Sequence, residues 1–484
     1  MYTAENPPSP RNGLPSFLLL LLVTLALRFD ALGDPNLHGD EVFYHTVGVA
    51  MHHGALPYVD VWDRKPFGLF AVFWLIAAFS EHVLAYQIVA ALFAAGTAWA
   101  VAAIARHWTS ARGSLLAGVL YLLYLKPLQG FGGQSPVLYN LFMALAALLV
   151  FRALPALREG RVPASVPAAM LLAGTGITLK TTALAEAAFL GLFAAWTLWR
   201  AVPDKARVLR QAALWALIGA APTLVIALAY WLNGHFAEYW HAMVTSNLSK
   251  PPHWPTSMAR LKIMAALLVP AMVLALLGLL RQESERGFVI AWIVAAVIGL
   301  WSMPNFYLHY AMPLAVPLCL AAAAFLARGL IGIAIVLVLA ALSLNALPPK
   351  IGHAARSAAA IDRLVRAIET HRGPGPLFLY DAPPQLYVRT GQPFVTPLVF
   401  PTHLSQLTEK DTSHLSTLAE TRRVLALRPG AVAMAASPRN SPANLQTRAL
   451  VMAYVGANCR LVDMVDTPEW LKSDMIAVWG DCRR

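Results

Sequence analysis

The 484-residue sequence is poor in charge, because only 13% of its residues are Asp, Glu, Lys or Arg while 58% are hydrophobic. Soluble domains carry about a quarter charged residues, so an ordinary soluble enzyme is excluded. The composition also excludes intrinsic disorder, and the 34 Pro and 30 Gly follow no period that would indicate a fibrous chain. A mean hydropathy of +0.58 instead indicates a polytopic membrane protein.

Cysteine and nucleotide-binding motifs are also scarce. Cys319 lies in an apolar run and is typical of a small core residue, whereas Cys459 and Cys482 could pair if the C-terminal segment is extracytoplasmic. We find no Walker A motif, Rossmann glycine pattern or nucleophile elbow, so cytosolic nucleotide-sugar chemistry has no foothold. The absence of an internal repeat argues against an inverted-repeat transporter.

The formal net charge of +12 fits basic cytoplasmic loops that face anionic lipid. A span needs about 20 mainly apolar residues. Every second loop between the apolar segments is rich in Arg, which places the N-terminus in the cytoplasm and the C-terminus outside. Eleven segments are candidate spans: 14–32, 83–105, 113–127, 137–154, 164–180, 183–199, 211–232, 261–280, 287–303, 310–327 and 329–347.

The apolar segment Phe67–Phe79 has only 13 residues, too few for a full crossing. Counting it as a span would move the Arg-rich loops to the outside, so we interpret it as an interfacial or re-entrant helix.

The composition changes near residue 350, and we expect a transmembrane domain over 1–349 and a small extracytoplasmic α/β domain over 350–484. A helical pattern covers Ala354–Ile368. Short apolar runs then alternate with turn residues, at Leu377–Tyr380, Val424–Leu427, Ala431–Ala436 and Met475–Trp479.

The first external loop, residues 33–66, holds the densest group of charges. A helix is expected to begin near His38, with Asp40 as its N-cap and Gly54 after its end. Capping alone would explain Asp40. Similarly, Asp63-Arg64-Lys65 would be explained by an ion-paired anchor at the membrane surface. The functional alternative is a carboxylate base beside cations that hold an anionic leaving group.

Three motifs in this loop resemble the GT-C superfamily of membrane glycosyltransferases. They are Asp40-Glu41, the Gly-x-x-Pro-Tyr-x-Asp pattern that ends at Asp60, and Asp63-Arg64-Lys65-Pro66. The sequence is similar to the branch that contains protein O-mannosyltransferases, the lipid A aminoarabinose transferase and Rgt-type proteins. This resemblance implies an all-α membrane bundle with a periplasmic first loop, Asp40 as catalytic base and Lys65 near the donor phosphate.

The resemblance extends to Leu179–Thr182 and Tyr307–Tyr310, and two departures stand out. Arg64 occupies a position where many relatives have His. No acidic residue lies in Gly132–Pro136, where some relatives carry one, so a second carboxylate and its metal are not indicated.

Further site residues follow from the resemblance and from side-chain chemistry. Glu41 is a second catalytic candidate beside Asp40. The donor-phosphate candidates are Arg64, Lys65, Lys180, His309 and Tyr310. The candidates for an acceptor or lipid groove are Tyr58, Asp60, Asp63, Tyr239, Trp240, Asn247 and Lys250. The alternatives are ordinary: a snorkelling Lys180 and interfacial aromatic anchors in the other loops. Glu186, a lone acid in an apolar run, has no assigned role.

A metal site is not predicted. His45 and His52 are seven residues apart, which is not a tight His-x3-His chelate, and no cysteine joins them. Oxygen ligands of the kind that Mg²⁺ uses are present at Asp40, Glu41 and Asp60, but no cofactor is required for the expected reaction.

The sequence therefore predicts an inverting glycosyltransferase of the bacterial inner membrane. The donor would be a polyprenyl-phosphate-linked sugar, and the acceptor a hydroxyl of a glycolipid, lipopolysaccharide or protein at the periplasmic face. No nucleic acid is expected as partner. The alternatives are a transporter or lipid flippase, and a family member that only binds lipid carriers.

Overall fold

A computed structural model describes residues 13–249, 252–439 and 442–483. The chain forms two compact units. The helical unit comprises Met1–Phe29, Ile88–Ile226 and Pro252–Pro349, and the α/β unit comprises Asp30–Gln87, Ala227–Pro251 and Lys350–Arg484. The first external loop therefore belongs to the same compact unit as the C-terminal segment, although more than 260 residues separate them in sequence.

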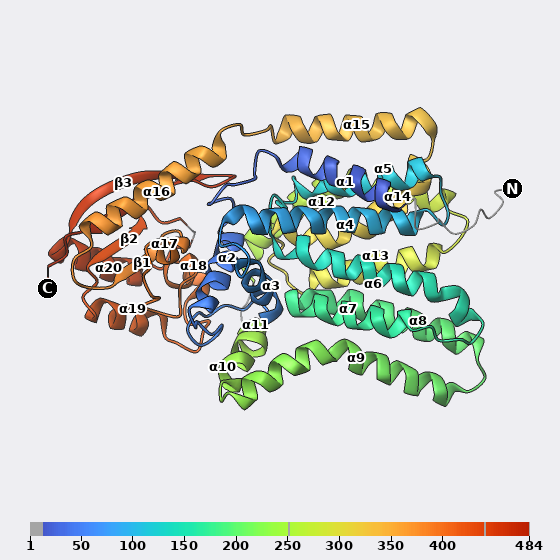
Figure 1. Ribbon diagram of the computed structural model, residues 1–484, viewed down its shortest axis with the longest axis horizontal. Helices are drawn as coiled ribbons and strands as arrows, with labels where there is room; N and C mark the ends of the chain where they lie inside the picture. Colours follow the sequence, from blue (N-terminus) through green and yellow to red (C-terminus); the bar gives the residue numbers. More distant parts are fainter. Residues whose placement is uncertain (1–12, 250–251, 440–441, 484) are drawn as a thin grey trace. The chain divides into compact units, whose positions relative to one another are not determined.

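Each of the eleven apolar segments contains a helix (Figure 1). These helices are α1 (Gly13–Arg28), α4 (Val83–Ala105), α5 (Ala111–Leu125), α6 (Ser135–Arg158), α7 (Ser165–Leu179), α8 (Leu184–Ala201), α9 (Lys205–Leu232), α12 (Trp254–Arg281), α13 (Arg286–Trp301), α14 (Met312–Leu326) and α15 (Gly329–Ala346).

Seven helical segments of the described chain are long and apolar enough to cross a membrane. They are Val83–Ala105, Ser135–Arg158, Thr181–Ala201, Lys205–Leu232, Trp254–Arg281, Leu308–Leu326 and Gly329–Ala346. Five apolar helices are shorter: α1, α5, α7, α13 and α3 (Phe67–Ala77). The protein is thus a multi-pass membrane protein, and the number of eleven spans stays a prediction.

Large apolar side chains cover much of the surface of this unit. Leu217 of α9 is 59% exposed and Leu330 of α15 is 81% exposed. Such an apolar surface is suited to contact with lipid. A helix can be placed in lipid because its backbone groups form hydrogen bonds within the helix. Inside the unit α12 packs closely against α14. A Cβ added at Gly278 would lie only 2.0 Å from the carbonyl oxygen of Ala321, so a larger residue would not fit there. Glycine at this crossing permits the two backbones to approach.

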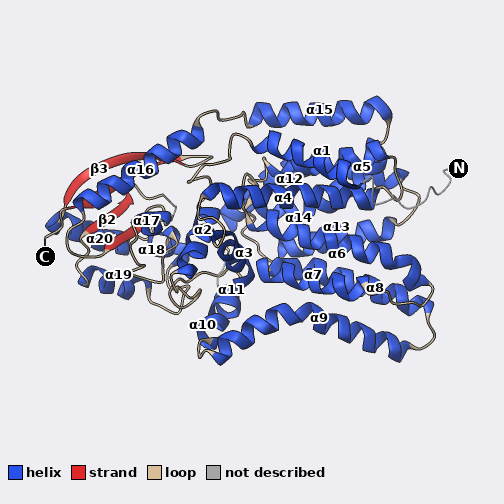
Figure 2. Ribbon diagram, in the orientation of Figure 1, coloured by secondary structure: helices blue, strands red, loops and turns tan. Residues whose placement is uncertain are grey.

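The α/β unit contains a four-stranded sheet in the order β1-β2-β4-β3 (Figure 2). Strand β1 (Leu377–Asp381) pairs in parallel with β2 (Ala431–Ala435), and β4 (Ser473–Gly480) pairs antiparallel with β2 and β3 (Arg460–Pro468). Helix α16 (His353–His371) packs against β3 and β4. The smaller helices of this part are α17 (Gln385–Arg389), α18 (Pro401–Ser405), η5 (Leu407–Glu409), α19 (Thr417–Ala426) and α20 (Leu445–Asn458).

Most expected elements of the C-terminal part form where the sequence predicts them. The helix over Ala354–Ile368 lies within α16, because its apolar residues repeat at helical spacing and are buried. Three of the short apolar runs form β1, β2 and β4, whereas Val424–Leu427 lies at the end of α19. Cys459 and Cys482 form a disulfide, and Cys319 is free and buried.

The first external loop contains α2 (Gly39–His52), which packs against α3 directly after the loop. A Cβ at Gly48 would lie 2.6 Å from the carbonyl carbon of Phe73, so glycine allows the two helices to touch. Helix α3 is the short apolar segment expected at Phe67–Phe79; its interfacial position stays a prediction. The α/β unit also includes the short helices α10 (Phe236–Trp240), η3 (His241–Thr245) and α11 (Ser246–Ser249).

Candidate active site

Asp40 lies in the first turn of α2, not at its N-cap. The cap is His38, whose extended backbone precedes the helix and whose ring Nδ1 accepts a hydrogen bond from the Asp40 amide at 3.2 Å. The expectation that Asp40 caps this helix is therefore wrong, because the helix already begins at Gly39 and His38 holds the extended backbone and the side-chain hydrogen bond of the cap. The Asp40 carboxylate instead contacts Lys65.

Lys65 bridges two carboxylates. Its Nζ lies 3.3 Å from Oδ1 of Asp40 and 3.3 Å from Oδ1 of Asp63. Asp63 also accepts a hydrogen bond from the Lys65 amide at 2.9 Å, an Asx turn that fixes the backbone of the motif. Lys65 and Asp40 are 19% and 17% exposed, so solvent reaches both. The sequence motifs thus meet in one cluster of a proton acceptor and a cation.

Two aromatic rings flank the Lys65 ammonium. Its nitrogen lies 5.5 Å from the centroid of Tyr44 and 5.1 Å from the centroid of Phe400. Both distances are within the range of a cation–π interaction. The Lys65 ammonium thus contacts both carboxylates and aromatic rings.

Tyr58 supports the backbone of the Asp63-Arg64-Lys65 motif. It is completely buried with a φ of 71°, and its hydroxyl donates a hydrogen bond to the carbonyl of Lys65 at 2.8 Å. Its ring lies 5.7 Å from that of Tyr239. Burial raises the pKa of Tyr58, so the phenol stays protonated as a donor. These contacts make Tyr58 and Tyr239 part of the support of Lys65.

C-terminal residues hold the other side of the motif. Arg64 donates hydrogen bonds to both carboxylate oxygens of Glu409, each at 2.9 Å. His403 Nε2 lies 3.7 Å from Asp63, and burial lowers the pKa of His403 to about 4, so its ring is neutral near pH 7. Sequence reasoning did not single out Phe400, His403 or Glu409, because no spacing links them to the loop more than 330 residues away.

The remaining candidates of this unit are more scattered. Glu41 is completely buried beside Tyr86. The Asp60 carboxylate accepts a hydrogen bond from the Leu56 amide, which closes a turn. Trp240 is 50% exposed, and the Asn247 amide donates to two carbonyls of its own helical segment. Lys250 lies outside the described residues.

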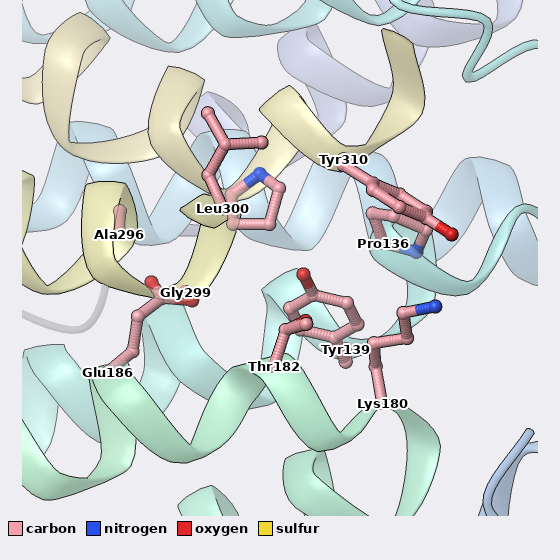
Figure 3. A pocket seen from close by; sticks show the side chains of 10 residues that line it. Pro136, Tyr139, Lys180, Thr182, Glu186, Ala296, Gly299, Leu300 and Tyr310 are labelled. Carbon is pink, nitrogen blue, oxygen red and sulfur yellow. The ribbon is translucent and has the colours of Figure 1, made fainter. Parts of the chain in front are cut away.

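The helical unit contains a second cluster. Lys180 follows α7 with an extended backbone, is 7% exposed, and places its Nζ 4.8 Å from the Tyr310 ring centroid. Both side chains line a pocket with an empty volume of about 320 Å³, open space included. Figure 3 shows Glu186 at the opposite end of this pocket from Lys180, with Tyr139 and Thr182 between them.

Glu186 and His309 are held in place by a hydrogen bond and by ring contacts, respectively. Glu186 is 3% exposed, and its carboxylate accepts a hydrogen bond at 2.7 Å from the indole of Trp292, which joins α8 to α13. His309, in the single turn η4 (Leu308–Ala311), is buried, with its ring stacked 5.7 Å from Tyr307 and edge-on 4.7 Å from Tyr310.

The candidate residues therefore form two clusters, one in each unit. The α/β cluster contains Asp40, Asp63, Arg64, Lys65 and Tyr58, and the helical cluster contains Lys180, His309 and Tyr310. Among the residues that the structure describes, no three His, Cys, Asp or Glu side chains are grouped as metal ligands would be.

No family model and no curated protein matches this sequence. The fold is similar to that of ArnT, a lipid A aminoarabinose transferase from Cupriavidus metallidurans. Its crystal structure bound to undecaprenyl phosphate aligns over 97% of this chain and 98% of that chain, with a TM-score of 0.61 and 13% identity. The apo structure of the same protein aligns over the same shares with a TM-score of 0.56 and 15% identity.

An oligosaccharyltransferase from Archaeoglobus fulgidus also matches, over 87% of this chain and 69% of that chain, with a TM-score of 0.48 and 12% identity. The similarity to ArnT extends through the membrane helices and the C-terminal sheet, since it covers nearly the whole of both chains. The fold that the loop motifs indicate is thus confirmed: the chain has the fold of ArnT, a bundle of apolar helices with a small C-terminal sheet.

Proposed function

We propose that the protein transfers a sugar from a polyprenyl-phosphate donor to an acceptor hydroxyl at the periplasmic face of the bacterial inner membrane. The observation that carries this proposal is the bridge from Lys65 to Asp40 and Asp63, because it joins a proton acceptor to a cation in one accessible cluster. The fold shared with ArnT, crystallised with undecaprenyl phosphate, supports a lipid-phosphate donor.

In this reaction the acceptor oxygen attacks the anomeric carbon with inversion. Asp40 takes the proton of the acceptor hydroxyl, a carbon–oxygen bond forms at the anomeric carbon, and the bond from that carbon to the phosphate oxygen breaks. Polyprenyl phosphate leaves with the electron pair. A positioned base contributes on the order of two to four powers of ten in rate.

Cations assist the departure of the phosphate. Lys65 neutralises the charge that develops on the leaving phosphate, and Lys180 with its neighbours His309 and Tyr310 forms the second group of phosphate ligands. In this proposal Lys65 is shared between the carboxylates and the phosphate, so donor binding draws the ammonium away from Asp40. Asp63 keeps the lysine in place because it also holds its amide.

The disulfide between Cys459 and Cys482 supports a C-terminal domain outside the cytoplasm. Disulfides persist in oxidising compartments such as the bacterial periplasm and are rare in the cytosol. The N-terminus is then cytoplasmic if the apolar helices cross an odd number of times, as the eleven predicted spans do.

Substitution of the base tests the proposal. Asp40→Asn is nearly isosteric but cannot accept the proton, so we expect transfer to fall by about 10²–10⁴-fold while the protein stays folded and inserted. The assay measures release of polyprenyl phosphate from a labelled lipid-linked sugar by the purified protein.

Asp362→Asn is the matched control, because Asp362 is an exposed partner of Arg389 in the same unit. This variant should retain wild-type turnover. Near-normal turnover of Asp40→Asn would contradict the assignment of the base. Movement of the lipid across a bilayer without cleavage would support the flippase alternative instead.

A further inference from the structure

The motif Asp63-Arg64-Lys65 is held by one continuous stretch of the C-terminal domain, residues 397–412, which we name the clamp segment. It contains α18 and η5. The backbone contact comes first: the amide of Trp62 donates a hydrogen bond to the carbonyl of Pro397 at 2.8 Å. The clamp segment therefore begins its contacts one residue before the motif.

Each residue of the motif then meets one side chain of the clamp segment. Asp63 lies 3.7 Å from His403, Arg64 forms the two hydrogen bonds with Glu409, and the Lys65 ammonium lies over Phe400. His403 and Glu409 are 3% and 7% exposed. Four consecutive residues of the loop are thus fixed by four positions of a segment that is distant in sequence.

The Arg64–Glu409 pair is the strongest of these contacts. Both bonds come from Nη2 of Arg64 and are 2.9 Å long, and charge-assisted hydrogen bonds of this kind are about twice as strong as neutral ones. Thr412 in turn donates its hydroxyl to the Glu409 carbonyl at 2.9 Å, which fixes the backbone of the acid. The charge of Arg64 is thereby neutralised by the protein itself.

We infer that Glu409 is a positioning residue that acts through Arg64 to hold Lys65 between Asp40 and the donor phosphate. Arg64 is then an anchor of the loop and not a ligand of the phosphate. This inference rests on the proposed function and refines it, since it moves one of the predicted phosphate ligands into the support of Lys65.

The direction of the change in affinity caused by one variant, Glu409→Gln, separates the two possible roles of Arg64. If Arg64 is an anchor, Glu409→Gln releases the loop, Lys65 shifts, and the affinity for a lipid phosphate falls. If Arg64 binds phosphate and Glu409 competes for it, Glu409→Gln removes a negative charge and the affinity rises. Misplacement of a site group by about 1 Å can cost about 10²-fold in rate.

The experiment measures binding of undecaprenyl phosphate to the full-length protein in lipid nanodiscs by native mass spectrometry. We expect Glu409→Gln and Arg64→Gln each to weaken binding by about 10-fold, which corresponds to the loss of one well-placed charge interaction. The double variant Arg64→Glu with Glu409→Arg should recover most of the affinity, because the ion pair is restored with reversed charges.

Glu469→Gln is the matched control, since Glu469 pairs with the buried Arg439 in the same domain and contacts no residue of the motif. It should lower the melting temperature as much as Glu409→Gln does and leave the affinity for undecaprenyl phosphate at the wild-type value. An equal loss of affinity in this control would reduce Glu409 to a general stability role and overturn the inference.

Two further results overturn the inference alone: tighter binding by Glu409→Gln, or a reversed pair that folds and binds as weakly as Arg64→Gln. In both cases the wild-type protein still binds undecaprenyl phosphate, and the proposed function stands. Failure of the wild-type protein to bind this lipid overturns the proposed function and the inference together.

Discussion

Two lysines, one from each of the two candidate clusters, are stabilised in different ways. Lys65 in the α/β unit lies between two carboxylates, whereas Lys180 in the helical unit lies over the ring of Tyr310. A carboxylate neutralises an ammonium and competes with an anionic ligand, whereas an aromatic ring stabilises an ammonium through its face without adding a negative charge. In the proposed reaction Lys65 therefore couples the leaving phosphate to the base Asp40, whereas Lys180 belongs to the second group of phosphate ligands.

The largest effect is expected from the two lysines themselves. Lys65→Met should lower transfer by about 10²–10³-fold, because it removes a phosphate ligand and leaves Asp40 and Asp63 as neighbouring carboxylates. One of these then takes up a proton at a higher pH, so the pH at half-maximal rate should rise. Lys180→Met should weaken donor binding without this shift, and pH–rate profiles of both variants measure the difference.

Identical pH–rate profiles for Lys65→Met and Lys180→Met would contradict the different roles assigned to the two lysines. Lys65→Arg is the control for charge, because it keeps a cation beside the carboxylates and should retain the wild-type pH dependence. The expected order of loss in transfer is Lys65→Met, then Lys180→Met, then Lys65→Arg.

A smaller effect is expected at the ring beneath Lys180. Tyr310→Leu removes the cation–π contact, so affinity for undecaprenyl phosphate should fall by about 2- to 30-fold, the equivalent of 0.5–2 kcal/mol. Tyr310→Phe keeps the ring and should lose less. Titration of both variants with the lipid measures the difference, and equal losses would assign the effect to the hydroxyl group instead.

A different kind of effect, on the pH dependence of stability, is expected in the α/β unit. Burial lowers the pKa of His403 from 6.5 to about 4, so the folded protein disfavours the protonated ring. Its contribution to stability is complete above pH 6.5 and is lost as the pH falls from 6.5 toward 4. At pH 5 the loss amounts to about 2 kcal/mol. Melting temperatures at pH 7 and pH 5 measure it, and His403→Gln should flatten this dependence.

His45 also contributes to the pH dependence of the melting temperature, because burial lowers its pKa to about 4 as well. The His403→Gln variant should therefore retain part of the pH dependence. A melting temperature that falls equally in wild type and variant would show that His403 does not contribute.

The sequence was informative where the physical signal is local. Apolar runs predict each membrane helix, and helical spacing predicts α16, because burial of one face needs a repeating pattern. Strand β3 is not predicted in this way, since it is an edge strand with polar and exposed residues such as Arg460 and Asp466. Likewise the cap of α2 was misassigned, because His38 and Asp40 both offer a side-chain acceptor and only the backbone geometry decides between them.

The residues of the α/β cluster show the same limit of prediction from local sequence patterns. Asp40, Asp63 and Lys65 belong to one loop, and the motif itself predicts that they meet. Phe400, His403 and Glu409 reach this loop only through tertiary structure. Their segment carries no recognisable spacing, so a single sequence contains no signal for the contact. The fold brings these residues to the motif, and the sequence alone specifies only the half of the cluster that is local.

The disulfide also determines how the sheet ends. Cys459 directly precedes β3 and Cys482 follows β4, so the bond closes the open end of the hairpin that these strands form. Because β3 is the outermost strand of the sheet, its detachment would expose a free edge to other chains. The disulfide keeps β3 attached even when its hydrogen bonds open. It thereby protects the domain against aggregation through this edge during folding and at raised temperature.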